Sequence, residues 1–227
     1  AGLPQVKYGS FAWCDYDRDG YPDFIITGST VAQFDGEANP VTQLWRNTGT
    51  GFEEVFVPGL EAAGRGADWA DYDQDGRTDF VIAGFKVAEL WRNIGDSFER
   101  VSEWNMAPVF GPLIFGDYNH DGRDDLFVTG GTALEVYTRL WRNTGTGFEL
   151  YPVAGVKDLT AAAAAWGDYD GDGRLDFFHM GFDGNSEQLH FSEIWRNVSE
   201  GSNSVPTAPT GLSATIGTEV EVEWSAG

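Results

Sequence analysis

The chain has 227 residues, a hydrophobic fraction of 41% and a formal net charge of −22, from 14 basic and 36 acidic residues. This balance argues against nucleic acid as a partner, because no basic stripe is available to neutralise phosphates. No apolar run is long enough to cross a bilayer, so we expect no membrane insertion. The single cysteine, Cys14, cannot form an internal disulfide, and we expect it to be a small buried residue.

An acidic motif occurs four times along the chain and reads D-x-D/N-x-D-G-x-x-D in each copy. The copies begin at Asp15, Asp71, Asp117 and Asp168. Carboxylates at positions 1, 3 and 5 offer hard oxygen ligands, and the glycine at position 6 permits the sharp turn around an ion. Without a cation the acidic groups would repel one another strongly. The motif therefore predicts about four Ca²⁺ ions, one in each repeat.

The expected ligands are the side chains at positions 1, 3, 5 and 9 and the backbone carbonyl at position 7. The side-chain ligands are Asp15, Asp17, Asp19, Asp23, Asp71, Asp73, Asp75, Asp79, Asp117, Asn119, Asp121, Asp125, Asp168, Asp170, Asp172 and Asp176. The backbone carbonyls are those of Tyr21, Arg77, Arg123 and Arg174. Asn119 is a neutral oxygen ligand, which lowers the charge of the third site.

The residues that flank the loops exclude an EF-hand. That motif needs a glutamate at position 12, and here the position holds Ile26, Ile82, Val128 and His179. Short apolar, β-branched or aromatic runs precede and follow each loop, and each following run ends in glycine. These runs predict a calcium-binding turn between two antiparallel strands. The alanine-rich stretch Leu159–Ala165 favours a helix in isolation, but it aligns with the entry strand of the fourth repeat.

A second signature, an aliphatic residue followed by Trp-Arg-Asn, follows each loop. Its four copies are Leu44–Asn47, Leu90–Asn93, Leu140–Asn143 and Ile194–Asn197. After the first three copies comes a strand that begins with Phe-Glu. A period of about fifty residues with about four strands predicts an all-β fold of propeller blades. The predicted blades are 1–57, 58–103, 104–153 and 154–197.

The tryptophans are expected to pack between neighbouring blades rather than to bind a ligand. The arginine of each Trp-Arg-Asn is expected to stack on an aromatic ring or to pair with a loop carboxylate of its own blade. The alternative is a ring of arginines on one face that binds an anionic ligand. No Ser/His/Asp or Cys/His constellation is recognisable, so we expect no catalytic residues.

Together these motifs resemble the FG-GAP repeat of integrin α-subunit propellers and the VCBS-type repeats of secreted bacterial proteins. The resemblance covers roughly residues 8–197, and the calcium loop is its specific part. It implies that the loops lie at the blade edge on one face of the propeller and bind Ca²⁺ through positions 1, 3, 5 and 9.

The two ends of the chain predict an incomplete unit. Residues 198–207 have the composition of a linker, and 208–227 resemble the truncated start of a fibronectin type III sandwich. We expect the first blade to lack an outer strand and the fourth to lack its Phe-Glu strand. The blades are then part of a larger propeller or assembly, because an open arc exposes apolar blade faces.

The leading functional interpretation is a non-catalytic calcium-binding module of a secreted or cell-surface protein. It would serve adhesion, glycan or protein binding, or extracellular scaffolding, with further copies of the protein as another partner. The extracellular location follows from the millimolar calcium that such modules need. We expect a ligand surface at the variable segments Gly28–Val41 and Gly181–Ser192. The alternatives are an accessory domain of a polysaccharide-degrading enzyme and a structural subunit of a surface fibre or layer.

Overall fold

The computed structural model describes residues 2–30, 39–84, 86–102, 104, 106–132, 135–184 and 189–198, together with the strands at 210–216 and 220–225. Every regular element in these ranges is a β-strand, as the short apolar, β-branched or aromatic runs predict. Among the described residues no helix is long and apolar enough to cross a membrane.

The strands form four antiparallel sheets in which sequence neighbours pair side by side. The first sheet contains β1 (Phe11–Cys14), β2 (Asp23–Ser29), β3 (Pro40–Asn47) and β4 (Phe52–Val55). The second contains β5 (Gly64–Ala70), β6 (Asp79–Gly84), β7 (Ala88–Asn93) and β8 (Phe98–Arg100). The third contains β9 (Leu113–Gly116), β10 (Asp125–Gly131), β11 (Val136–Asn143) and β12 (Phe148–Tyr151). The fourth contains β13 (Thr160–Gly167), β14 (Asp176–Phe182) and β15 (His190–Trp195).

The pairing register makes each acidic loop the connection between the first two antiparallel strands of its sheet. The residue just before the loop lies opposite the aspartate at position 9, as in the pairs Cys14↔Asp23 and Ala70↔Asp79. The third and fourth sheets repeat this with Gly116↔Asp125 and Gly167↔Asp176. The loop is therefore held at both ends by a ladder of strand hydrogen bonds.

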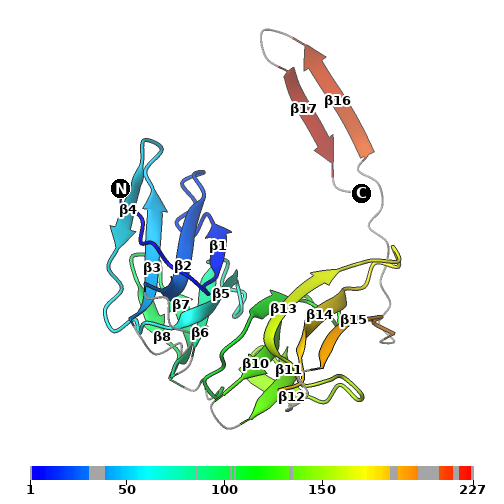
Figure 1. Ribbon diagram of the computed structural model, residues 1–227. Helices are drawn as coiled ribbons and strands as arrows, with labels where there is room; N and C mark the ends of the chain where they lie inside the picture. Colours follow the sequence, from blue (N-terminus) through cyan, green and yellow to red (C-terminus); the bar gives the residue numbers. More distant parts are fainter. Residues whose placement is uncertain are drawn as a thin grey trace.

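The four sheets are arranged as the blades of a β-propeller, which confirms the predicted fold class. Figure 1 shows them following one another in an arc, with β1–β4 at one end and β13–β15 at the other. Neighbouring sheets meet through apolar clusters, and β5 contacts both β2 and β9. Trp45 and Trp91 are 6% and 2% exposed, so these two tryptophans are core residues. Trp13 is not a core residue, because 57% of its surface is exposed.

The first blade has four strands, so the expectation that it lacks an outer strand is wrong. The Phe-Glu strand that begins at Phe52 pairs with β3 and is the outer strand of its own blade. Within the described residues the fourth sheet contains three strands. The alanine-rich stretch forms most of β13, because pairing with β14 overrides the helix propensity of alanine. Cys14 is half-buried and free, and burial raises the pKa of its thiol to about 11.

The C-terminal residues form a separate hairpin of β16 (Thr210–Ile216) and β17 (Val220–Ser225), which pair only with each other. Most of the predicted linker, residues 199–207, lies outside the described residues. A fibronectin type III domain therefore stays a prediction from the sequence.

Candidate metal centres

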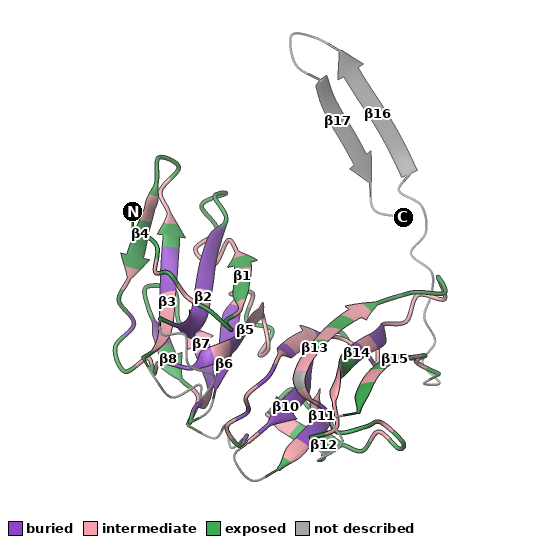
Figure 2. Cartoon of the chain, in the orientation of Figure 1, coloured by how far each residue is buried: buried purple, intermediate pink, exposed green. Residues whose placement is uncertain are grey.

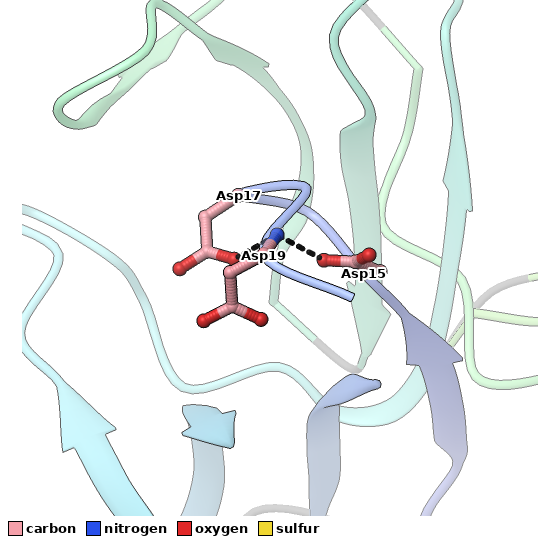
Figure 3. A group of neighbouring side chains, drawn as sticks. All are labelled: Asp15, Asp17 and Asp19. Atoms are coloured by element: carbon pink, nitrogen blue, oxygen red, sulfur yellow. Dashed lines mark hydrogen bonds between the residues drawn. The ribbon is translucent and has the colours of Figure 1, made fainter. Parts of the chain in front are cut away.

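The first acidic loop folds around its own carboxylates. The backbone N–H of Asp19 donates to Asp15 Oδ1 at 3.1 Å and to Asp17 Oδ1 at 3.2 Å, as Figure 3 shows. The N–H of Gly20 donates to Asp15 Oδ2 at 3.0 Å. Gly20 has φ 87°, a left-handed conformation that other residues rarely adopt. These bonds draw the three carboxylates to one side of the turn.

The third and fourth loops repeat these bonds, and the second repeats all of them except the bond from position 5 to the first aspartate. The glycine at position 6 donates to the first aspartate at 2.9 Å in the second loop and at 2.8 Å in the third and fourth. In the first, second and fourth loops, three carboxylates bring ligand oxygens within 4.8 Å of one another. These groups are Asp15, Asp17 and Asp19; Asp71, Asp73 and Asp79; and Asp168, Asp170 and Asp176. In the third loop the N–H of Asp121 donates to Asn119 Oδ1 at 2.9 Å, so the amide replaces the carboxylate without altering the turn.

The aspartates at position 9 are buried at the base of the loops, with 0% or 1% exposure. One oxygen of each accepts the N–H of the Asn in Trp-Arg-Asn, and the other accepts the N–H of the tyrosine at position 2. For Asp79 these bonds are 2.7 Å from Asn93 and 3.1 Å from Tyr72. Burial is the main cause that raises the pKa of Asp79 and of Asp125 to about 7, and neighbouring loop aspartates add to it.

These sites fit a hard cation. The donor set is oxygen only, which suits Ca²⁺. Asp71 Oδ1, at position 1 of the second loop, is buried and has no hydrogen-bond partner among the described residues. Burial raises the pKa of Asp79, so a positive charge beside it would stabilise the ionised carboxylate. A divalent ion in the loop would supply that charge and a partner for Asp71 Oδ1. The side chains and the position-7 carbonyls stay predicted ligands.

The arginines of three Trp-Arg-Asn segments pair with loop carboxylates of their own blades. Arg46 Nε lies 2.6 Å from Asp17 Oδ2, and its Nη2 lies 3.0 Å from Asp19 Oδ2. Arg196 contacts Asp170 and Asp172 in the same way, whereas Arg92 lies 3.8 Å from Asp73 and also pairs with Glu99. Arg142 pairs with Glu149 instead. These pairs support the strand-end role rather than a ring of arginines that binds an anion.

The asparagine of Trp-Arg-Asn joins neighbouring blades, a role that the sequence did not reveal. Its side-chain amide donates to the backbone carbonyl of position 2 in the preceding loop. Asn93 reaches Tyr16 at 3.1 Å, Asn143 reaches Tyr72 at 2.7 Å and Asn197 reaches Tyr118 at 2.6 Å. The presence of asparagine in all four copies was the available signal.

A pocket of about 490 Å³ lies between the second and third blades and was also missed. Trp104 and Trp141 line it, and the indole nitrogens of both are buried without a hydrogen-bond partner among the described residues. The other blades place an acceptor two residues before the tryptophan. Gln43, Glu89 and Glu193 accept the indole N–H of their blades at 3.2, 3.0 and 3.1 Å.

In the third blade this position is Arg139, which cannot accept a hydrogen bond. The indole N–H of Trp141 is therefore buried without an acceptor among the described residues. Comparing the four repeats position by position is the sequence signal that identifies this pocket.

The sequence matches the model of the FG-GAP-like repeat in three overlapping segments, residues 15–82, 71–128 and 117–179. The chain belongs to the FG-GAP-like repeat family. Each matched segment begins at an acidic loop and runs through the next loop, so the acidic loops described above are part of the FG-GAP repeat.

Among solved structures, the chain is similar to a lectin of Agrocybe aegerita, described for its specific recognition of non-reducing terminal N-acetylglucosamine. The identity is 19% and the TM-score 0.51, with 86% of this chain and 50% of the other covered. This likeness shows the fold alone, and the chain spans about half the length of that lectin. No curated protein matches the sequence.

Proposed function

We propose that this chain is a non-catalytic, calcium-binding FG-GAP module of a secreted or cell-surface protein, and that it binds a glycan. The second loop carries the calcium proposal. There Asp71 Oδ1, which has no hydrogen-bond partner among the described residues, lies beside the buried Asp79, whose pKa is raised to about 7. The other loops share its hydrogen bond from the glycine at position 6 to the first aspartate, and in them the other oxygen of that aspartate accepts the N–H of position 5. Extracellular calcium is in the millimolar range in which such modules bind.

Metal analysis and calorimetric titration test the calcium proposal. We expect four Ca²⁺ ions per chain at millimolar calcium, held through the sixteen side chains and four carbonyls given above. Asp172→Ala should remove one ion and leave three, because each loop uses its own ligands. Asp158→Ala is the matched control, since Asp158 pairs with Arg139 outside the loops. Fewer than two ions in the unaltered chain would contradict the proposal.

The pocket between the second and third blades supports a glycan as the ligand. Its volume lies in the range of small-molecule sites. Sugar hydroxyls can accept the unpaired N–H groups of Trp104 and Trp141, and Arg92, Glu99 and Arg100 add charged groups at the pocket wall. The recognition of N-acetylglucosamine by the structurally similar lectin makes that sugar the first ligand to test.

Arg139→Gln tests the pocket by giving Trp141 an acceptor, and it also removes the ion pair between Arg139 and Asp158. The new side chain should accept the N–H of Trp141, as Gln43 does for Trp45 in the first blade. We expect binding of N-acetylglucosamine, followed by tryptophan fluorescence, to weaken about tenfold, which corresponds to the loss of one hydrogen bond of about 1.4 kcal/mol. Arg100→Gln, at the pocket wall, separates loss of charge from loss of the indole donor. Unchanged affinity in Arg139→Gln would exclude the indole as a contact.

A further inference from the structure

Among the described residues, nothing covers one face of the fourth blade, although the same face of the other three blades is buried. Ile194 is 63% exposed, whereas the residues at its position in the other blades, Leu44, Leu90 and Leu140, are at most 3% exposed. Met180 is 44% exposed, whereas the residues at its position in the other blades, Thr27, Ala83 and Thr129, are fully buried. In Figure 2, β15 carries exposed and intermediate colours, in contrast with the buried β10. We call this side of each blade, which carries Ile194 and Met180 in the fourth, its leading face.

In the other three blades, the following blade covers the leading face by a repeated set of contacts. Trp69 Nε1 donates to the carbonyl of Ala12 at 3.1 Å, and Trp166 Nε1 donates to that of Ile114 at 3.4 Å. Each interface also contains the bond from the Trp-Arg-Asn asparagine to the position-2 carbonyl of the preceding loop. Aromatic side chains of the following blade fill the space between these bonds.

The first blade presents the complementary donors on its opposite surface, its trailing face. Trp13 occupies the position of Trp69 and Trp166, and its ring packs edge-on against Phe24 of the same blade. The side-chain amide of Asn47 donates to Pro22 of its own blade, but among the described residues it has no preceding loop to reach. The acceptors that these donors meet elsewhere correspond to Ala165 and Tyr169 on the fourth blade.

We propose that the trailing face of the first blade docks onto the leading face of the fourth blade in a second copy of this chain. Trp13 Nε1 would donate to the carbonyl of Ala165, and Asn47 Nδ2 to the carbonyl of Tyr169, while Ile194 and Met180 are buried beneath the aromatic side chains. The contact continues the internal interfaces of the propeller by one further step. Because two different faces meet, the association is heterologous, head to tail.

The two faces are accessible to another copy. Figure 1 places the first and fourth sheets at opposite ends of the arc. Tyr169 is 59% exposed and Trp13 57% exposed, so a partner can reach both without unfolding either blade. Exposed apolar patches of this kind mark association sites in soluble proteins.

Analytical ultracentrifugation of the chain in millimolar calcium tests the association. We expect a mass that rises with concentration above the 24.9 kDa of the monomer. Ile194→Glu should reduce the association at least tenfold, and since Ile194 is already exposed, the blade should still fold, as circular dichroism can check. Val198→Glu is the matched control, because Val198 is exposed on the same blade but lines a pocket toward the third blade. A monomer at 100 µM would overturn the proposal.

Mixing two variants tests the head-to-tail arrangement. Ile194→Glu spoils the leading face and keeps the trailing face, whereas Trp13→Glu does the reverse. Neither should associate alone, but their mixture should form a one-to-one complex. A complex formed by Trp13→Glu alone would show that two leading faces bind each other, and the absence of any mixed complex would equally overturn the proposal.

Discussion

At the scale of single residues, the buried aspartate at position 9 combines an observed structural role in each blade with an expected role as a calcium ligand. It accepts two backbone N–H groups that close the loop, and it is the most buried of the expected calcium ligands. In the second and third blades, burial raises the pKa of this carboxyl, Asp79 or Asp125, to about 7, and the N–H donors offset only part of that effect. A cation in these loops would favour the ionised carboxylate.

The pKa of Asp79 and of Asp125, about 7, predicts that the free energy of unfolding of the calcium-free protein decreases as the pH rises. An unfolded aspartate has its ordinary pKa of 3.8, so the folded state binds more protons between pH 4 and pH 7. The free energy of unfolding should therefore fall as the pH rises through this window. Calcium should oppose the fall by stabilising the ionised form, and calcium affinity should decrease as the pH falls below 7.

Urea unfolding at pH 5 and pH 7.5, in chelator and in calcium, measures both effects. Asp79→Asn is the control, since an amide keeps an acceptor oxygen but cannot titrate. This variant should show a smaller slope in chelator than the unaltered protein. Stability that increases from pH 5 to pH 7.5 in chelator would show that the buried aspartates are already compensated.

At the scale of the strand, close backbone approach fixes where the first strand of each blade can lie. A Cβ on Gly111 would lie 2.1 Å from the carbonyl oxygen of Thr129, and one on Gly9 would lie 1.8 Å from that of Thr27. Neither contact can relax through a flexible side chain, because the obstructing atoms are backbone. Glycine therefore sets the spacing between the entry segment and the second strand.

Gly111→Ala should consequently destabilise the third blade by about 1–3 kcal/mol, the usual cost of forcing extra volume into a packed site. Gly167→Ala should be neutral or slightly stabilising, because its added Cβ would meet nothing within 4 Å and φ there is not left-handed. Comparing the urea midpoints of the two variants checks the prediction. Equal midpoints would mean that the entry segment can move away from β10.

At the scale of the whole molecule, the blades are joined by apolar clusters and by the asparagine bonds between successive loops. The contribution of these asparagine bonds to the free energy of unfolding can be separated from that of the hydrogen bonds that the same asparagines make within their own blades. Asn143 is 1% exposed, and its side chain bonds both Asp124 of its own blade and Tyr72 of the preceding one. Asn47 makes the local bond to Pro22 but none to another blade among the described residues.

Asn143→Ala should therefore cost about 1.5–3 kcal/mol of unfolding free energy, because it leaves a buried carbonyl unpaired. Asn47→Ala should cost roughly 1 kcal/mol or less, since only the local turn is affected. Thermal unfolding in saturating calcium compares the two. A loss in Asn47→Ala as large as in Asn143→Ala would place the stabilisation in the turn rather than between the blades.

The sequence by itself determined the acidic loops, the strands that flank them, the period of the repeat and hence the class of fold. These features depend on residues close together in the chain, where ligand spacing, glycine at position 6 and apolar alternation act locally. Only the tertiary structure showed that Asn143 bridges to the preceding loop, that Trp141 keeps a free indole N–H and that Ile194 lies on an uncovered face. Each of these is decided by which blade packs beside which, and that depends on contacts between residues far apart in sequence. The sequence placed Phe52–Val55 within the first blade, but only the strand pairing showed that this strand completes the blade and that no outer strand is missing from it.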